Sequence, residues 1–148
     1  MKQELLNKIA ETLHENSLNY SVSLGIFTSQ HKKSLTNEEI ICKTLNSNVS
    51  FYEMHSVEKQ EILHTVMSSL MYAGDEGSGP SKENINSHKF KSLLRDLTIS
   101  LTKIISSSTE NYSFCIKDGH PYYPVFWDFS FLFVRNNFSL VFIGTSSD

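Results

Sequence analysis

The six histidines are the side chains best suited to bind a metal or exchange protons near neutral pH. His55 and His64 are nine residues apart, and the other four are scattered along the sequence. No two have the HxxxH or HExxH spacing that places two imidazoles on one helix face, and none belongs to a paired Cys/His motif. We therefore expect the histidines to hold no metal.

Asp118, His120 and Ser130 are residue types found in hydrolytic triads, but nothing in their spacing brings them together. The GxSxG sequence that exposes a nucleophilic serine is absent, as are the GxGxxG and GxxxxGK[ST] motifs. The glycine-rich stretch 74–80, GDEGSGP, does not form a lysine-bearing phosphate cradle between a strand and a helix. These patterns predict no catalytic residue and no cofactor.

Asp128 is an acidic residue inside an apolar stretch, residues 125–134. If its face of a strand is covered, the carboxylate needs a partner, because an unpaired buried charge costs several kcal/mol. Arg95 or a backbone N–H is a suitable partner. An enzyme site built from Asp118, His120 and Asp128 remains an alternative that requires a pocket around them.

Charge is unevenly distributed along the chain. Residues 53–76 contain five acidic residues and one lysine, whereas residues 82–103 contain five basic and two acidic residues. An acidic surface steers association with a basic partner, although a solvated helix face gives the same pattern. Tyrosines are enriched at interaction hot spots. The candidate partner-binding residues are Glu58, Glu61, Tyr72, Asp75, Glu76, Tyr122 and Tyr123.

Length and composition indicate one globular domain over residues 1–148. A net charge of −3 gives no general attraction to nucleic acid or to anionic membranes. The N-terminus does not resemble a signal peptide, and no apolar run is long enough to cross a bilayer. Cys42 and Cys115 fit buried free thiols in a reducing compartment. We expect a cytoplasmic protein that binds neither nucleic acid nor membrane.

Apolar residues at helical spacing predict four helices. Thr36 and Glu39 form a capping-box pattern at the start of one, and Ser56 is a suitable N-cap for another. The glycines and proline of residues 74–81 exclude a regular element and predict a flexible loop. The predicted helices cover residues 3–16, 37–45, 57–73 and 84–106.

The last 37 residues hold seven of the ten Phe and the only Trp, and their alternation predicts an antiparallel meander. Its strands cover residues 112–117, 125–134 and 138–143, and the central one is apolar on both faces at its far end. Residues 18–26 also alternate, although positions 18, 22 and 26 fit a helical stripe as well. The predicted fold class is α+β, with N-terminal helices packed on the C-terminal meander and one further N-terminal strand as an option.

The C-terminal segment resembles the ending of small immunity proteins of bacterial contact-dependent inhibition and polymorphic toxin systems. The resemblance covers Pro124 to Asp148, where VFWDFSFLF is followed by a polar hairpin and LVFIGTSSD. It implies a non-enzymatic cytoplasmic protein that binds one cognate toxin domain tightly. It transfers no binding residues, because such families use different surfaces for different toxins.

Two functions of different classes follow. The first is an immunity protein whose acidic residues occlude the basic cleft of a toxin, in particular a nuclease. The second is a small ligand-binding or regulatory α+β module associated with a larger enzyme, with a pocket on the second face of the central strand and Asp128 at its base.

Overall fold

The computed structural model describes all residues, 1–148, and has the predicted α+β fold. Its helices and strands alternate in the first half of the chain, and three strands end it. In chain order the elements are α1 (Gln3–His14), β1 (Ser21–Gln30), α2 (Asn37–Leu45), β2 (Ser50–Ser56), α3 (Lys59–Leu70), α4 (Lys82–Asn86), α5 (His88–Ser107), β3 (Glu110–Asp118), β4 (Trp127–Arg135) and β5 (Phe138–Ser147).

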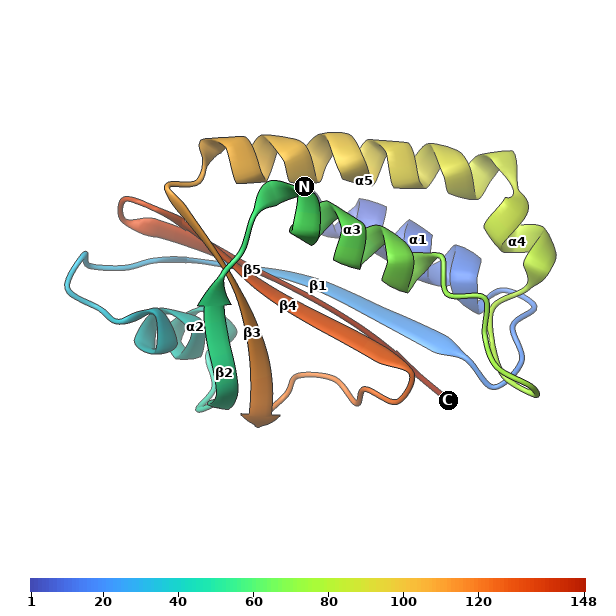
Figure 1. The fold of residues 1–148 in the computed structure, drawn as a ribbon, viewed down its shortest axis with the longest axis horizontal. Coiled ribbons are helices and arrows are strands. Elements are labelled where there is room, and N and C mark those ends of the chain that lie inside the picture. The colour runs from blue at the N-terminus through green and yellow to red at the C-terminus, as the bar shows by residue number, and fades with distance from the viewer.

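The five strands form one antiparallel sheet in the order β1-β5-β4-β3-β2 (Figure 1). The predicted meander of β3, β4 and β5 is its interior, and both edge strands come from the first half of the chain. Strand β3 pairs with β4 only over Glu110–Ser113, opposite Phe131–Val134. Beyond that point β3 pairs only with β2, and β4 only with β5.

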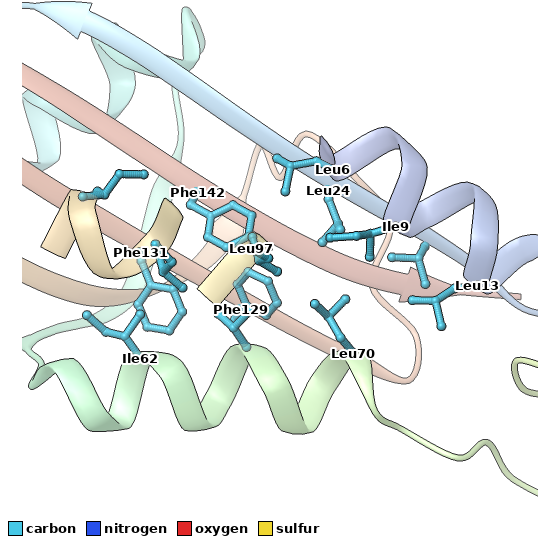
Figure 2. Packing of buried hydrophobic residues seen from close by; sticks show 14 of the residues in the cluster. Leu6, Ile9, Leu13, Leu24, Ile62, Leu70, Leu97, Phe129, Phe131 and Phe142 are labelled. Atoms are coloured by element: carbon cyan, nitrogen blue, oxygen red, sulfur yellow. The ribbon is translucent and has the colours of Figure 1, made fainter. Parts of the chain in front are cut away.

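Helices α1, α3, α4 and α5 contribute to a large core on one face of the sheet (Figures 1 and 2). Alternate side chains of β4 point into this core, and the Phe129 ring stacks on that of Phe131 at a centroid distance of 5.7 Å. Each fully buried phenylalanine stabilises the fold by about 1.5–3 kcal/mol. The aromatic residues of the sheet therefore mainly build the core.

The opposite face has a smaller core of seven buried residues, to which α2 contributes Ile40 and Ile41. The capping box predicted for this helix is present, since the Thr36 Oγ1 accepts from the Glu39 N–H at 3.2 Å and Glu39 Oε2 accepts from the Thr36 N–H at 2.7 Å. Leu132 of β4 packs here, so the far end of the central strand is covered on both faces.

Strand β1 starts and ends later than the predicted strand 18–26. Asn16 and Asn19 adopt positive φ values of 54° and 42°, which asparagine tolerates better than most residues, so the chain turns there. Residues 28–30 continue the strand beyond the predicted alternation because β5 is long enough to pair with them up to Gln30 opposite Phe138.

Strand β2 was not predicted, because its side chains do not alternate. Register shifts between Ser50 and Phe51 and between Phe51 and Glu53 interrupt its pairing with β3. Phe51 and Met54 therefore both contact the smaller core although they are three residues apart. Ser56 ends this strand, and the N-cap of α3 is Glu58, which makes no side-chain capping bond.

The predicted helix 84–106 is two helices, α4 and α5, separated at Ser87. Ser87 has extended backbone angles, and its Oγ accepts from the Phe90 N–H at 3.1 Å. Serine is a favourable N-cap, so it starts a new helix. The short α4 also contacts the end of α1, since Asn84 Nδ2 donates to the Thr12 carbonyl at 3.1 Å.

Candidate partner-binding surface

Helix α3 separates the predicted acidic residues into two pairs. Glu58 and Glu61 lie at its N-terminal end, whereas Asp75 and Glu76 follow its C-terminal end. A helix of 12 residues is about 18 Å long. The two pairs therefore lie on different parts of the surface (Figure 1), and all four side chains are exposed.

Glu58 and Glu61 have a structural role that needs no partner. They occupy the N-cap and first turn of α3, where negative charge interacts favourably with the helix dipole. Neither carboxylate takes part in a salt bridge. This pair is consequently the weaker part of the predicted binding surface.

The loop that carries Asp75 and Glu76 is a tight turn. The Asp75 N–H donates to the Ser78 carbonyl at 2.8 Å, and Ser78 N–H donates to the Asp75 carbonyl at 3.3 Å. Gly74 has a φ of 87°, and a Cβ there would lie 2.4 Å from the Ser78 carbonyl oxygen, so the turn requires glycine. As predicted, residues 74–81 contain no regular helix or strand before α4; their flexibility stays a prediction.

Two backbone hydrogen bonds attach this turn to the connection between α1 and β1. The Leu18 N–H donates to the Gly79 carbonyl at 3.0 Å, and the Gly79 N–H donates to the Leu18 carbonyl at 2.8 Å. Leu18 itself is 60% exposed, although its place in an alternating pattern suggested a strand residue. The attachment places an exposed leucine beside the acidic turn.

Tyr72 belongs to an aromatic cluster that joins the end of α3 to the start of β4. Its ring lies 6.1 Å from the Tyr20 ring and 6.0 Å from the Phe126 ring, measured between centroids. Trp127 Nε1 donates to the Tyr20 hydroxyl at 2.9 Å. Tyr72 is half-buried, so part of its ring stabilises the fold and the remainder is available to a partner.

The Asp75 carboxylate beside the Tyr72 hydroxyl raises the pKa of this phenol from 10.0 to about 12. A hydrogen bond from the neutral phenol to the carboxylate is lost when the phenol ionises, and the two negative charges then repel. The interaction links the predicted anchor Tyr72 directly to the predicted acid Asp75.

We expect Asp75→Asn to return the pKa of Tyr72 from about 12 towards 10. Because the folded-state pKa is raised, the stabilisation is present below pH 10 and is lost as the pH rises from 10 towards 12. NMR titration of the tyrosine ring carbons measures this directly. Glu76→Gln, one residue away, is the matched control and should leave the Tyr72 titration unchanged; equal titrations in both variants would contradict the assignment.

The two neighbouring tyrosines behave differently. Tyr122 is half-buried against the smaller core, and its hydroxyl lies 2.2 Å from the place where a Cβ on Gly25 would be. Burial raises the pKa of the Tyr122 phenol. Tyr123 is 77% exposed. Of the two, only Tyr123 presents a whole ring to a partner.

Val125, not singled out as a binding residue from the sequence, is 47% exposed and precedes Phe126 of the aromatic cluster. Its N–H donates to the Ser146 carbonyl of β5 at 2.8 Å, which holds it against the sheet. It lay in a predicted strand, so no local signal marked it as exposed. We name the set Leu18, Tyr72, Asp75, Glu76, Tyr123 and Val125 the loop-end surface.

The residues considered for a hydrolytic triad have other contacts. Asp118 Oδ2 accepts from the Ser50 hydroxyl at 2.8 Å, and His120 Nδ1 accepts from the Tyr122 N–H at 3.0 Å. The Ser130 hydroxyl and His120 Nε2 are buried without a hydrogen-bond partner. No hydrogen bond joins any two of these three side chains.

Asp128 is exposed, so its face of the strand is not covered there and the carboxylate needs no buried partner. It lies at the start of β4, where β3 no longer pairs, so that part of the face is open to solvent. Burial lowers the pKa of His120. The negative charge of Asp128 acts in the opposite direction, but its effect on this pKa is smaller. Arg95 is likewise exposed on α5.

Cys115 is also exposed, contrary to the expectation of a buried thiol, whereas Cys42 is half-buried. It lies in the half of β3 that pairs only with β2, and the Glu53 carboxylate accepts from its thiol at 3.6 Å. Partial desolvation of the thiol and the charge of Glu53 raise the pKa of Cys115, which lowers its reactivity. No group of three or more His, Cys, Asp or Glu is arranged to hold a metal ion.

No helix of the structure has the length and apolar character needed to span a membrane. No protein-family model and no curated protein matches the chain. Two crystal structures of citrus MAF1 are similar at 16% identity, one covering 97% of this chain and 98% of that protein with a TM-score of 0.49, the other covering 99% of both with a TM-score of 0.40. At these values the similarity supports no assignment of function.

Proposed function

We propose that this chain is a non-catalytic immunity protein that binds a cognate bacterial toxin domain in the cytoplasm and occludes its active site. The observation that carries the proposal is the exposed acidic turn of Asp75 and Glu76, which adjoins Tyr72 and is attached by backbone hydrogen bonds to the exposed Leu18. Apolar and aromatic anchors supply binding energy, and the carboxylates favour a basic cleft such as that of a nuclease.

The turn geometry suits such a role. Asp75 and Glu76 are held by the backbone hydrogen bonds of the turn and by its attachment to Leu18, so less conformational entropy is lost on binding. The exposed Leu18 is attached to this turn, and the exposed Tyr123 and Val125 lie on the connection that enters β4. Charge would thus increase the rate of association, and the apolar side chains would slow dissociation.

The first test is to look for a toxin gene beside the gene of this chain and to express the two proteins together. Cells that make the toxin should grow only when this chain is also present, and the two proteins should purify together. A toxin that still kills in the presence of the chain would contradict the immunity function itself.

The second test compares the two acidic pairs. We expect Asp75→Lys with Glu76→Lys to slow association with the toxin about tenfold or more at low salt, because steering of a basic cleft becomes repulsion. Glu58→Lys with Glu61→Lys makes the same change in net charge at the other end of α3 and is the matched control. Stopped-flow association at two salt concentrations measures the effect; similar rates for both variants would exclude the loop-end surface.

A small ligand-binding module is the second candidate, and the hollows of the surface favour it. None of five hollows of the surface is lined by Asp128, so the pocket expected to have Asp128 at its base is not among them. Three hollows whose lining together holds more basic than acidic residues lie around Arg135, at the other end of β4.

A further inference from the structure

Three hollows of the surface meet at Arg135, the last residue of β4. Their lining includes six of the thirteen Lys and Arg residues but only two of the sixteen Asp and Glu residues. The formal charge of this region is therefore +4, although that of the whole chain is −3. The basic residues lining the hollows are Lys2, Lys8, Lys32, Lys43, Lys103 and Arg135.

The most polar of the three, which we call the cationic hollow, has a volume of about 640 Å³. Lys32, Lys43 and Arg135 line it together with Asn136 and Asn137, and no acidic residue does. The only salt bridge of the protein joins Lys8 to Glu4, so the three cations of this hollow have no acidic partner. Like charges placed together without a counterion repel, and an anion bound between them would relieve that repulsion.

The walls of the cationic hollow are held in place. His31 is buried, and its Nε2 lies 2.6 Å from the Ser139 hydroxyl of β5. Its backbone N–H donates to the Asn137 carbonyl at 2.9 Å, which fixes the segment carrying Lys32 to the hairpin between β4 and β5. Arg135 in turn donates to the hydroxyl of Ser107 at the end of α5. The site is thus largely formed before a ligand enters.

A second hollow, which we call the apolar hollow, shares Arg135 and Phe138 with the first. It has a volume of about 370 Å³, and six of its eight lining residues are hydrophobic, among them Ile104, Phe133 and Leu140. The two volumes lie in the range of small-molecule sites, about 300–1,000 Å³. A charged site therefore adjoins an apolar site of a size that suits a ring.

We propose that the cationic and apolar hollows together bind a small phosphate-bearing molecule, with its phosphates between Lys32, Lys43 and Arg135 and its ring beside Phe138. Arginine binds phosphate oxygens through two parallel hydrogen bonds, and lysine adds point charge. The asparagine amides supply further donors. This site lies at the end of β4, whereas Val125 of the loop-end surface precedes the start of the same strand.

Calorimetric titration of the whole chain with three probes tests the composition of the ligand. Adenosine diphosphate carries both parts, pyrophosphate only the phosphates, and adenosine only the ring. We expect adenosine diphosphate to bind at one site, pyrophosphate to bind at least about tenfold more weakly, and adenosine to be weakest, because each part fills one hollow. Absence of saturable binding by adenosine diphosphate, or binding of a single-stranded oligonucleotide in its place, would overturn the proposal.

Variants test the location. We expect Lys32→Ala with Lys43→Ala to weaken adenosine diphosphate about tenfold or more, since each charge-assisted contact is worth about that factor. Lys89→Ala with Lys91→Ala removes the same charge from exposed positions outside the hollows and should leave binding unchanged. Phe138→Ala should weaken adenosine diphosphate but not pyrophosphate. Equal loss in both lysine pairs would show general charge attraction and reject the site.

Discussion

Phe142→Ala is expected to lower the free energy of unfolding by about 3–5 kcal/mol, the range for removing a buried phenylalanine. Phe142 is fully buried at the centre of β5 and lies between its strand partners Ile26 and Phe131. Its ring meets that of Phe129 edge to face, with centroids 5.0 Å apart (Figure 2). Alanine would leave a cavity under the helices, and the interdigitated aromatic neighbours could fill it only partly.

Urea denaturation followed by circular dichroism measures this loss. Phe138→Ala is the matched control, because it removes the same side chain from the same strand at a position that is 37% exposed. We expect the control to cost far less, since little buried volume is lost. Comparable losses in the two variants would mean that β5 is not the centre of the core.

The second large effect is expected for Gly144→Val, which should destabilise the protein by about 1–3 kcal/mol or more through overpacking. A Cβ at position 144 would lie 2.2 Å from Phe129 Cζ and 2.8 Å from Leu24 Cδ2. Gly144 pairs with both of these residues, so the ring of Phe129 lies over the glycine. The ring cannot move aside easily, because it also stacks on Trp127 at 5.9 Å and on Phe131.

A double variant separates this steric cause from a loss of strand stability. Phe129→Leu should be destabilising alone, but combined with Gly144→Val it should cost less than the sum of the two single losses, because the smaller side chain makes room. The coupling is read from denaturant midpoints and slopes of the four proteins. Strict additivity would contradict the steric explanation.

Local sequence patterns predicted the helices and strands whose own residues alternate between apolar and polar positions. The spacing of Leu6, Ile9 and Leu13 and the capping box at Thr36 led to helices that the structure confirms. These signals depend only on neighbours within about four residues. The break at Ser87 was missed because the apolar spacing continues through it, although its serine is itself a capping signal.

The candidate sites were less accessible from the sequence. Composition identified Asp75, Glu76 and Tyr72, but could not show that α3 places Glu58 and Glu61 at its other end. The exposure of Asp128 and Cys115 follows from the divergence of β3 and β4, which no local pattern records. The cationic hollow combines residues from three separate segments: the end of β1 with the loop after it, α2, and the β4–β5 hairpin.

The sequence by itself determined the α+β class, the C-terminal meander and the aromatic core, because hydrophobic periodicity along a chain is a local property that the folded core must satisfy. Only the tertiary structure decided the two edge strands, the exposed ends of the sheet and the meeting of unpaired cations at Arg135. Those features arise from pairing between segments far apart in the chain, such as β1 with β5, and the energy of such pairing is not contained in either segment alone.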